Sequence, residues 1–159
     1  MQTFLPHSMF SMCAHFLDNK RLNKQILECD TLIDLHEGRR DNNWKNHPAF
    51  KMWIGYVSAL KSYRDYMLSE WLKRGKKNKR QFYGVNETDF IDIPGFVYDD
   101  RVILSYRSNL VRKLPEFYKE YGWEDYGIEG YYWPCEVKTK KSQQINEQWN
   151  KILTEIGGV

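Results

Sequence analysis

The sequence contains few cysteines, and the three that are present lie far apart along the 159 residues. Cys13, Cys29 and Cys135 are odd in number, which argues against a disulfide framework and favours a reducing compartment. No segment is long and apolar enough to span a bilayer, and no secretory hydrophobic region follows Met1. We therefore expect a cytoplasmic protein with no membrane partner, long enough to form one domain with a buried core.

The sequence also lacks the common motifs of nucleotide-binding and hydrolytic sites. It has no phosphate-binding glycine-rich loop, no GxSxG turn and no HExxH pair. The spacing of Cys13, His15 and Cys29 is poor for a metal site, so we expect no metal ligands. A cysteine–histidine nucleophile pair stays open, but the spacing gives it no support.

Positive charge exceeds negative charge only slightly, since the net charge is +3, but the basic residues are concentrated in two clusters. One cluster runs from Lys73 to Arg80, and the second comprises Lys138, Lys140 and Lys141. Such clusters either neutralise phosphates or form solvated loops, and the pattern favours neither. Aromatic residues make up 16% of the chain, and those that a core does not need are suited to stacking on bases.

The stretch from Leu17 to Gly38 has the clearest helical pattern in the chain. Asp18 is a good N-cap and Gly38 a good stop. Apolar residues at helical spacing predict a face that points into the core: Leu22, Ile26, Cys29 and Ile33.

A second face of the same helix carries Arg21, Lys24 and Glu28, because steps of three and seven residues stay on one side of a helix. Two interpretations are open. Lys24 and Glu28 form an ordinary exposed pair that contributes about 0.3 kcal/mol, or Glu28 is a functional acid beside two bases. The pattern alone favours the ordinary pair.

Caps and helix breakers predict the remaining elements. Ser8 is expected to cap a short helix over Met9 to Leu17. Pro48 is expected to open a long helix that ends at Arg74, with Gly55 inside it permitting either a close helix contact or a close approach of the N-terminal segment. A loop over residues 76–95 follows, in which Pro94 and Gly95 are breakers.

Three more helices complete the prediction. One begins at Tyr98 or Asp99 and a short one begins at Pro115, whereas Ser142 caps the last helix, closed by Gly157 and Gly158. We find no pattern of alternating strands. The sequence therefore predicts an all-α fold, a single compact domain over residues 1–159 with several helices and long irregular loops, in which residues 142–156 form an extra C-terminal helix.

Several segments, taken in order, resemble the pyrimidine-dimer DNA glycosylase/AP lyase family of the phage endonuclease V type. They are Leu17-Asp18, Lys20-Arg21-Leu22, Lys24-Gln25 and Glu28, then Asn46-His47-Pro48, Trp71-Leu72-Lys73-Arg74-Gly75 and Phe117-Tyr118-Lys119-Glu120-Tyr121-Gly122. The resemblance covers roughly Met1 to Pro134. It differs from some members at Leu27, where they have an arginine. It implies an N-terminal segment packed between the two longest helices, and a location in the host cytoplasm if a phage encodes the protein.

The resemblance also implies a mechanism. The α-amine of the first residue, here Met1 because Gln2 disfavours its removal, attacks C1′ of the damaged nucleotide and forms an imine, and β-elimination then cuts the strand. An α-amine has a typical pKa of about 7.7–8.0, so a useful fraction is neutral at pH 7. Glu28 is implied as the acid/base and charge partner. The mechanism requires no metal or organic cofactor.

The resemblance further implies residues that contact DNA. Each has a plainer alternative, a solvated or a core position: Arg21, Lys24, His15, Arg107, Arg112, Lys113, Tyr118 and Tyr121. Asn46 and His47 are expected to cap a helix rather than to catalyse. The expected partner of this monomer is double-stranded DNA with a damaged or modified pyrimidine, and the lesion stays open. The alternatives are a nucleic-acid-binding module of the same fold without catalysis and a small helical interaction protein.

Overall fold

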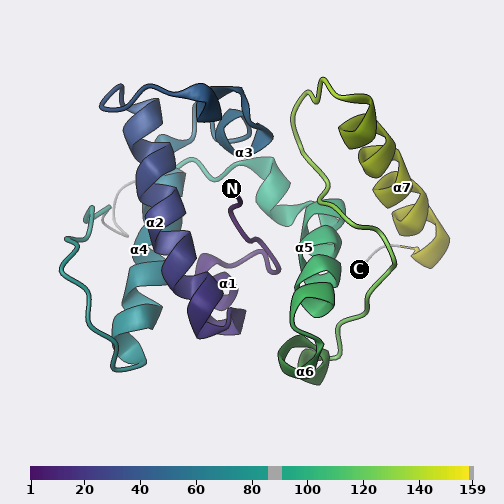
Figure 1. Cartoon of the computed structure of the whole chain (residues 1–159), viewed down its shortest axis with the longest axis horizontal. Coiled ribbons are helices and arrows are strands. Elements are labelled where there is room, and N and C mark those ends of the chain that lie inside the picture. The colour runs from purple at the N-terminus through teal and green to yellow at the C-terminus, as the bar shows by residue number, and fades with distance from the viewer. Residues whose placement is uncertain (86–90, 158–159) are drawn as a thin grey trace. The chain divides into compact units, whose positions relative to one another are not determined.

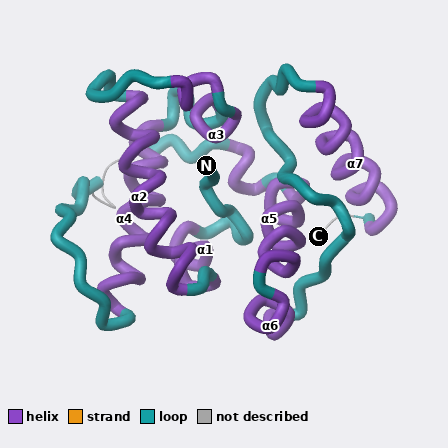
Figure 2. Tube along the Cα trace, in the orientation of Figure 1, coloured by secondary structure: helices purple, strands orange, loops and turns teal. Residues whose placement is uncertain are grey.

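The protein is described here by a computed structural model, which covers residues 1–85 and 91–157. Within these ranges the chain forms seven α-helices and three short 3₁₀ helices, and it has no strand (Figure 2). The all-α prediction is confirmed. The chain divides into two compact units, Met1–Phe4 with Met9–Pro94 and Leu5–Ser8 with Gly95–Val159. That residues 1–159 form one domain stays a prediction.

The first unit is built on a pair of packed helices. Its elements are α1 (Phe10–Phe16), α2 (Asn19–His36), η1 (Asn43–Asn46), α3 (Pro48–Lys51) and α4 (Val57–Lys73) (Figure 1). Helix α2 packs against α4, and α1 packs against α4 as well. The predicted core face of α2 is fully buried at all four positions, Leu22, Ile26, Cys29 and Ile33. The pattern of apolar residues therefore predicted correctly which side of α2 faces the interior.

The two ends of α2 follow from local chemistry. The carboxylate of Asp18 accepts a hydrogen bond from the backbone N–H of Arg21, as expected of an N-cap. Gly38 directly follows the C-cap residue Glu37 and has a φ of +76°. This left-handed conformation ends the helix and strongly favours glycine.

The predicted long helix from Pro48 to Arg74 is wrong, because the chain breaks it into α3 and α4. Gly55 has a φ of +84°, which no α-helix accommodates, and α4 begins only at Val57. A Cβ atom on Gly55 would meet open space, so this glycine serves the turn and not a close helix contact.

Two predicted caps are also wrong. Helix α1 has Met9 at its N-cap position and no side-chain cap there, so Ser8 does not cap it. Helix α7 begins earlier than predicted, because Thr139 and not Ser142 is its N-cap. The Thr139 hydroxyl accepts a hydrogen bond from the N–H of Ser142 at 3.1 Å. Gly157 closes α7 as predicted, whereas Gly158 and part of the predicted loop over 76–95 lie outside the described residues.

The second unit is organised around one central helix. Its elements are η2 (Gly95–Tyr98), α5 (Asp100–Lys113), α6 (Pro115–Tyr118), η3 (Lys119–Tyr121) and α7 (Lys140–Ile156). Helix α5 packs against both α6 and α7. Asp99 caps α5 and Pro115 opens α6, as the sequence predicted. Within the described ranges, we find no helix with the length and hydrophobicity needed to cross a lipid bilayer.

Trp149 anchors α7 in the second unit. Its side chain is fully buried and packs with Leu104 of α5 and with Ile128. The indole N–H donates a hydrogen bond to the carbonyl of Gly130 at 3.0 Å. The C-terminal helix is therefore an integral part of this unit.

We predict that Trp149→Ala lowers the free energy of unfolding by about 3–5 kcal/mol, because it leaves a large cavity and removes one of the two hydrogen bonds to the Gly130 carbonyl, which also accepts from Asn109 Nδ2 at 2.7 Å. Urea denaturation followed by circular dichroism measures this change. Gln148→Ala, at the neighbouring exposed position on α7, serves as the control and is expected to stay within about 0.5 kcal/mol. Equal effects of the two substitutions would contradict the anchoring role of Trp149.

Candidate active site

The first four residues of the chain are held between α2 and α4. The N–H of Phe4 donates to Gln25 Oε1 at 2.7 Å, and the Tyr63 hydroxyl donates to the Phe4 carbonyl at 2.7 Å. Gln25 Nε2 donates to the Gln2 carbonyl at 2.6 Å. The Gln25 side chain is fully buried and so supplies partners for backbone groups that water does not reach. This agrees with the expected packing of the N-terminal segment between these helices.

Thr3 gives the same segment a second attachment, to the turn between α3 and α4. The indole N–H of Trp53 donates to the Thr3 hydroxyl at 3.0 Å, and this hydroxyl lies 4.0 Å from Met52 Sδ. Thr3 and Trp53 are both fully buried. The N-terminal segment is therefore packed as part of the unit, unlike the frayed ends that are common in proteins.

Glu28, on α2, lies beside the start of this attached segment. The backbone N–H of Gln2 donates to Glu28 Oε2 at 2.9 Å, and the carboxylate side chain is only 15% exposed. Bond lengths keep consecutive backbone nitrogens within about 4 Å, so the Met1 amine lies within about 7 Å of that oxygen. The structure thus brings the two catalytic candidates, Met1 and Glu28, into one site.

The two bases predicted beside Glu28 behave differently. Lys24 Nζ lies 3.7 Å from Glu28 Oε1 with its side chain 70% exposed, so the ordinary pair expected from the spacing is present. Arg21 pairs with Asp18 at 3.1 Å instead. Gln25 enters the sequence-based prediction only as part of a family motif and without a role, although a polar residue that is three positions from Leu22 and four from Cys29 lies on the apolar face and signals a buried hydrogen-bonding group.

His47 lies beside the amine on the α3 side. Its Nδ1 accepts the N–H of Ala49 at 3.0 Å, so it caps α3 as predicted. Burial lowers the pKa of His47, and the positive charge of the N-terminal amine lowers it further; Figure 1 shows the N-terminal end next to α3. The His47 imidazole is therefore largely neutral at pH 7, since the ordinary histidine pKa is already below 7.

An open hollow of about 570 Å³ adjoins His47 on the first unit. It is lined by Asn42, Asn43, Trp44, Asn46, His47 and Pro48. The Trp44 ring centroid is 5.3 Å from that of His47. This hollow was not predicted, although a tryptophan in an otherwise polar loop was a signal for it.

Comparison with known protein families connects this geometry to an activity. Residues 1–84 match the family described as pyrimidine dimer DNA glycosylase, and they are more than half of the chain. The chain belongs to the pyrimidine dimer DNA glycosylase family. A comparison with curated proteins and one with solved structures each found no match.

Membership of this glycosylase family confirms the resemblance drawn from the motifs. From this membership it follows that the substrate class is DNA. The kind of activity is cleavage of a glycosidic bond in DNA repair. The match to the glycosylase family contains Met1 and Glu28. It ends before α5, so it does not include the candidate DNA contacts of the second unit.

The candidate DNA-contacting residues of this glycosylase are in three different situations. His15 is exposed on α1, and its carbonyl accepts a hydrogen bond from Arg74 Nη2 at 3.1 Å. Arg107 donates to the Pro6 carbonyl at 2.7 Å. Arg112 and Lys113 are exposed at the end of α5. Arg112 also lies 3.8 Å from Asp125 Oδ1 and 3.6 Å from Glu129 Oε2, and Lys113 Nζ lies 5.7 Å from the ring centroid of Tyr131.

The two tyrosines of the second unit differ in exposure. Tyr118 is fully buried and its ring stacks on Trp123 at a centroid distance of 5.9 Å, so it occupies the core position that the sequence offered as the alternative to a DNA contact. Tyr121 is partly exposed and packs on Trp123 at 4.9 Å. Tyr118 therefore belongs to an aromatic cluster with Phe117, Tyr121 and Trp123 and packs in its interior.

We predict that Gln25→Met lowers the free energy of unfolding of the glycosylase by about 2–4 kcal/mol, because it leaves the Phe4 N–H and the Gln2 carbonyl without their partner. Urea denaturation measures this loss, and amide hydrogen exchange at Phe4 is expected to become faster. Leu27→Ala, on the exposed side of α2, is the control and is expected to change stability by less than about 0.5 kcal/mol. An unchanged stability in Gln25→Met would show that the buried amide does not hold the N-terminal segment.

Proposed function

We propose that this protein is a DNA N-glycosylase with AP lyase activity that acts through an imine to its N-terminal amine. One observation carries the proposal: the Gln2 N–H binds the Glu28 carboxylate and so holds the first residue beside an acid. Membership of the pyrimidine dimer DNA glycosylase family supports the same chemistry.

In the first step, the neutral Met1 amine attacks C1′ of the damaged nucleotide. The bond between C1′ and the base breaks, and the base leaves with the electron pair and takes up a proton. The sugar ring then opens, and the nitrogen and C1′ form a protonated imine. An amine that is close to the reacting carbon and restrained by the protein needs little reorganisation to attack it.

In the second step, Glu28 removes a proton from C2′ of the imine. The electrons of that C–H bond form the C2′–C3′ double bond, and the 3′ phosphate leaves as the strand breaks. The same carboxylate stabilises the positive charge on the imine nitrogen, because it is largely shielded from water and already oriented by the Gln2 N–H.

Cations on both units hold the DNA in this proposal. Lys24 is exposed beside Glu28 and is positioned to bind a phosphate next to the reacting nucleotide. On the second unit, Arg112 and Lys113 at the end of α5 are the candidates for binding DNA phosphates. The substrate is a duplex with a damaged or modified pyrimidine, and the enzyme acts as a monomer.

We predict that Glu28→Gln reduces strand cutting at an abasic site by about 10²-fold or more and leaves DNA affinity within a few-fold, because it removes the base and keeps the shape. Single-turnover cutting and a binding titration measure the two effects. Asp34→Asn makes the same chemical change elsewhere on α2, where Asp34 pairs with Arg39, and is expected to cut normally. Parental cutting by Glu28→Gln would exclude Glu28 as the acid/base.

We also predict that extending the chain by two residues before Met1 abolishes covalent trapping by borohydride on abasic DNA, because the amine moves away from Glu28. The matched control carries the same two residues after Val159, and peptide mass spectrometry locates the attached sugar. Normal trapping by the N-terminally extended protein would exclude the amine. Binding without trapping in the parental protein would favour the alternative, a DNA-binding module without catalysis.

A further inference from the structure

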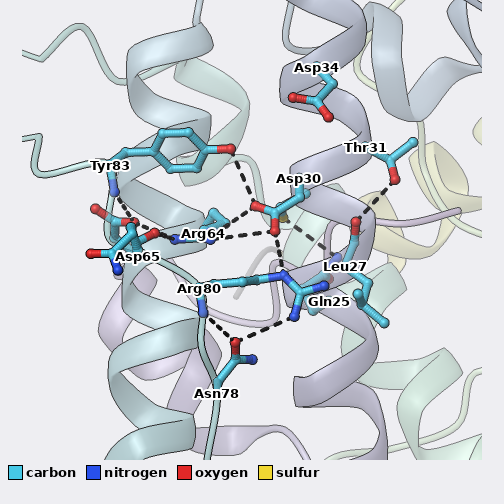
Figure 3. A network of polar contacts seen from close by, with 12 residues as sticks. Gln25, Leu27, Asp30, Thr31, Asp34, Arg64, Asp65, Asn78, Arg80 and Tyr83 are labelled. Carbon is cyan, nitrogen blue, oxygen red and sulfur yellow. Dashed lines mark hydrogen bonds and ion pairs between the residues drawn. The ribbon is translucent and has the colours of Figure 1, made fainter. Parts of the chain in front are cut away.

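A network of charged side chains joins α2 and α4 to the segment that follows α4 (Figure 3). Asp30 on α2 accepts Arg64 Nε at 2.7 Å and Arg80 Nε at 2.8 Å. Arg64 is only 3% exposed, so its charge requires its carboxylate partners, Asp30 and Asp65. The Tyr83 hydroxyl lies 3.3 Å from Asp30; burial and the negative charge of Asp30 raise the pKa of Tyr83 to about 12, so it stays protonated and donates.

The network also holds the backbone of this segment at several places. Trp71 Nε1 donates to the Lys77 carbonyl at 3.2 Å, and Arg64 Nη1 donates to the Gln81 carbonyl at 2.7 Å. Asp65 accepts the N–H groups of Tyr83 and Gly84, both at 3.0 Å. Residues 76–84, which we name the tethered loop, therefore have a defined backbone although they form no helix.

The arginines and the lysines of the basic cluster from Lys73 to Arg80 differ in their contacts. Arg74 pairs with Glu70 and donates to carbonyls of α1, and Arg80 pairs with Asp30. The lysines, in contrast, are exposed: Lys73, Lys76, Lys77 and Lys79. The arginines thus stabilise the loop, and the lysines present positive charge to solvent. An anionic partner that binds such a group of neighbouring lysines reduces the repulsion among their charges.

The tethered loop is a surface distinct from the site at the amine. Glu28 and Asp30 are two residues apart on α2, which turns their side chains about 200° from each other around the helix axis. Glu28 contacts the N-terminal segment, whereas Asp30 contacts Arg64 and Arg80. The tethered loop is therefore attached, through Arg80, to the side of α2 opposite Glu28.

We propose that the tethered loop is a second DNA-binding surface, which uses Lys76, Lys77 and Lys79 to bind backbone phosphates of duplex DNA irrespective of sequence or damage. DNA is the polyanion that fits, because the chain belongs to a family that acts on DNA. Since phosphates repeat along each strand, an array of exposed lysines on a held backbone binds them with little loss of loop entropy. The surface retains the protein on undamaged DNA, independently of the chemistry at the amine.

The test compares two triple variants with the same loss of charge. One is Lys76→Gln, Lys77→Gln and Lys79→Gln in the loop, and the control is Lys138→Gln, Lys140→Gln and Lys141→Gln, exposed in the second unit. Affinity for an undamaged duplex is measured against salt concentration. The loop variant is expected to lower the slope of log K against log salt by up to about 2.7, at about 0.9 per phosphate contact, and the control by less than about 1.

An equal change in both variants, no change in the loop variant, or no binding of the parental protein to undamaged duplex would overturn the proposal. Because the DNA carries no lesion, none of these results depends on strand cutting. Failure of the imine chemistry is thus distinguishable from failure of this inference.

A second experiment tests whether the tethers matter as well as the charge. Asp65→Asn removes a negative charge, which by itself tightens DNA binding, but it also removes the acceptor for the Gly84 N–H. We expect weaker binding by several-fold at constant salt. Asn78→Ala is neutral in charge and removes the acceptor for the Arg80 N–H, and it is expected to act in the same direction. Unchanged or tighter binding in folded forms of both variants would overturn the role of the tethers.

Discussion

The arrangement of the candidate active site depends on the hydrogen bonds of one buried amide. On the core-facing side of α2, the Gln25 side chain donates to the carbonyl of Gln2 and accepts from the N–H of Phe4. An extended chain end has no helix or sheet to satisfy its own polar groups, so it stays in the interior only if side chains do so. With this attachment the Gln2 N–H meets Glu28. A chain end that moved freely in solvent would have no fixed relation to that carboxylate.

Helix α2 organises two polar regions on opposite sides around its apolar face. On one side Glu28 meets the N-terminal segment, and on the other Asp30 meets Arg64 and Arg80. A straight helix keeps such groups at fixed angles, so the chemistry at the amine and the hold on the tethered loop are set by a single rigid element. This explains how a short chain provides both a proposed reaction site and a proposed backbone-binding surface without an additional domain.

Several features of the fold were predictable because they depend on short stretches of chain. The buried face of α2, its Asp18 cap, its Gly38 end and the starts of α5 and α6 all follow from periodicity, capping and proline geometry. The incorrect predictions also concern short stretches of chain. The break at Gly55 was missed because apolar residues continue at helical spacing on both sides of it, and Thr139 replaced Ser142 as a cap because both are good cap residues three positions apart.

The sequence by itself determined the all-α class, the family and the placement of Glu28 beside Lys24, because each of these rests on local spacing or on ordered motifs. Only the tertiary structure decided that the Gln2 N–H contacts Glu28, that Arg21 turns to Asp18, that Tyr118 is buried and that the backbone of the tethered loop is held at Lys77. The physical reason is that most of these contacts join residues from different elements. In the remaining case, Arg21, more than one carboxylate is near in the sequence, and the fold decides which of them is bound. Such choices depend on which surfaces become buried together, and the spacing of residues along one helix carries no information about them.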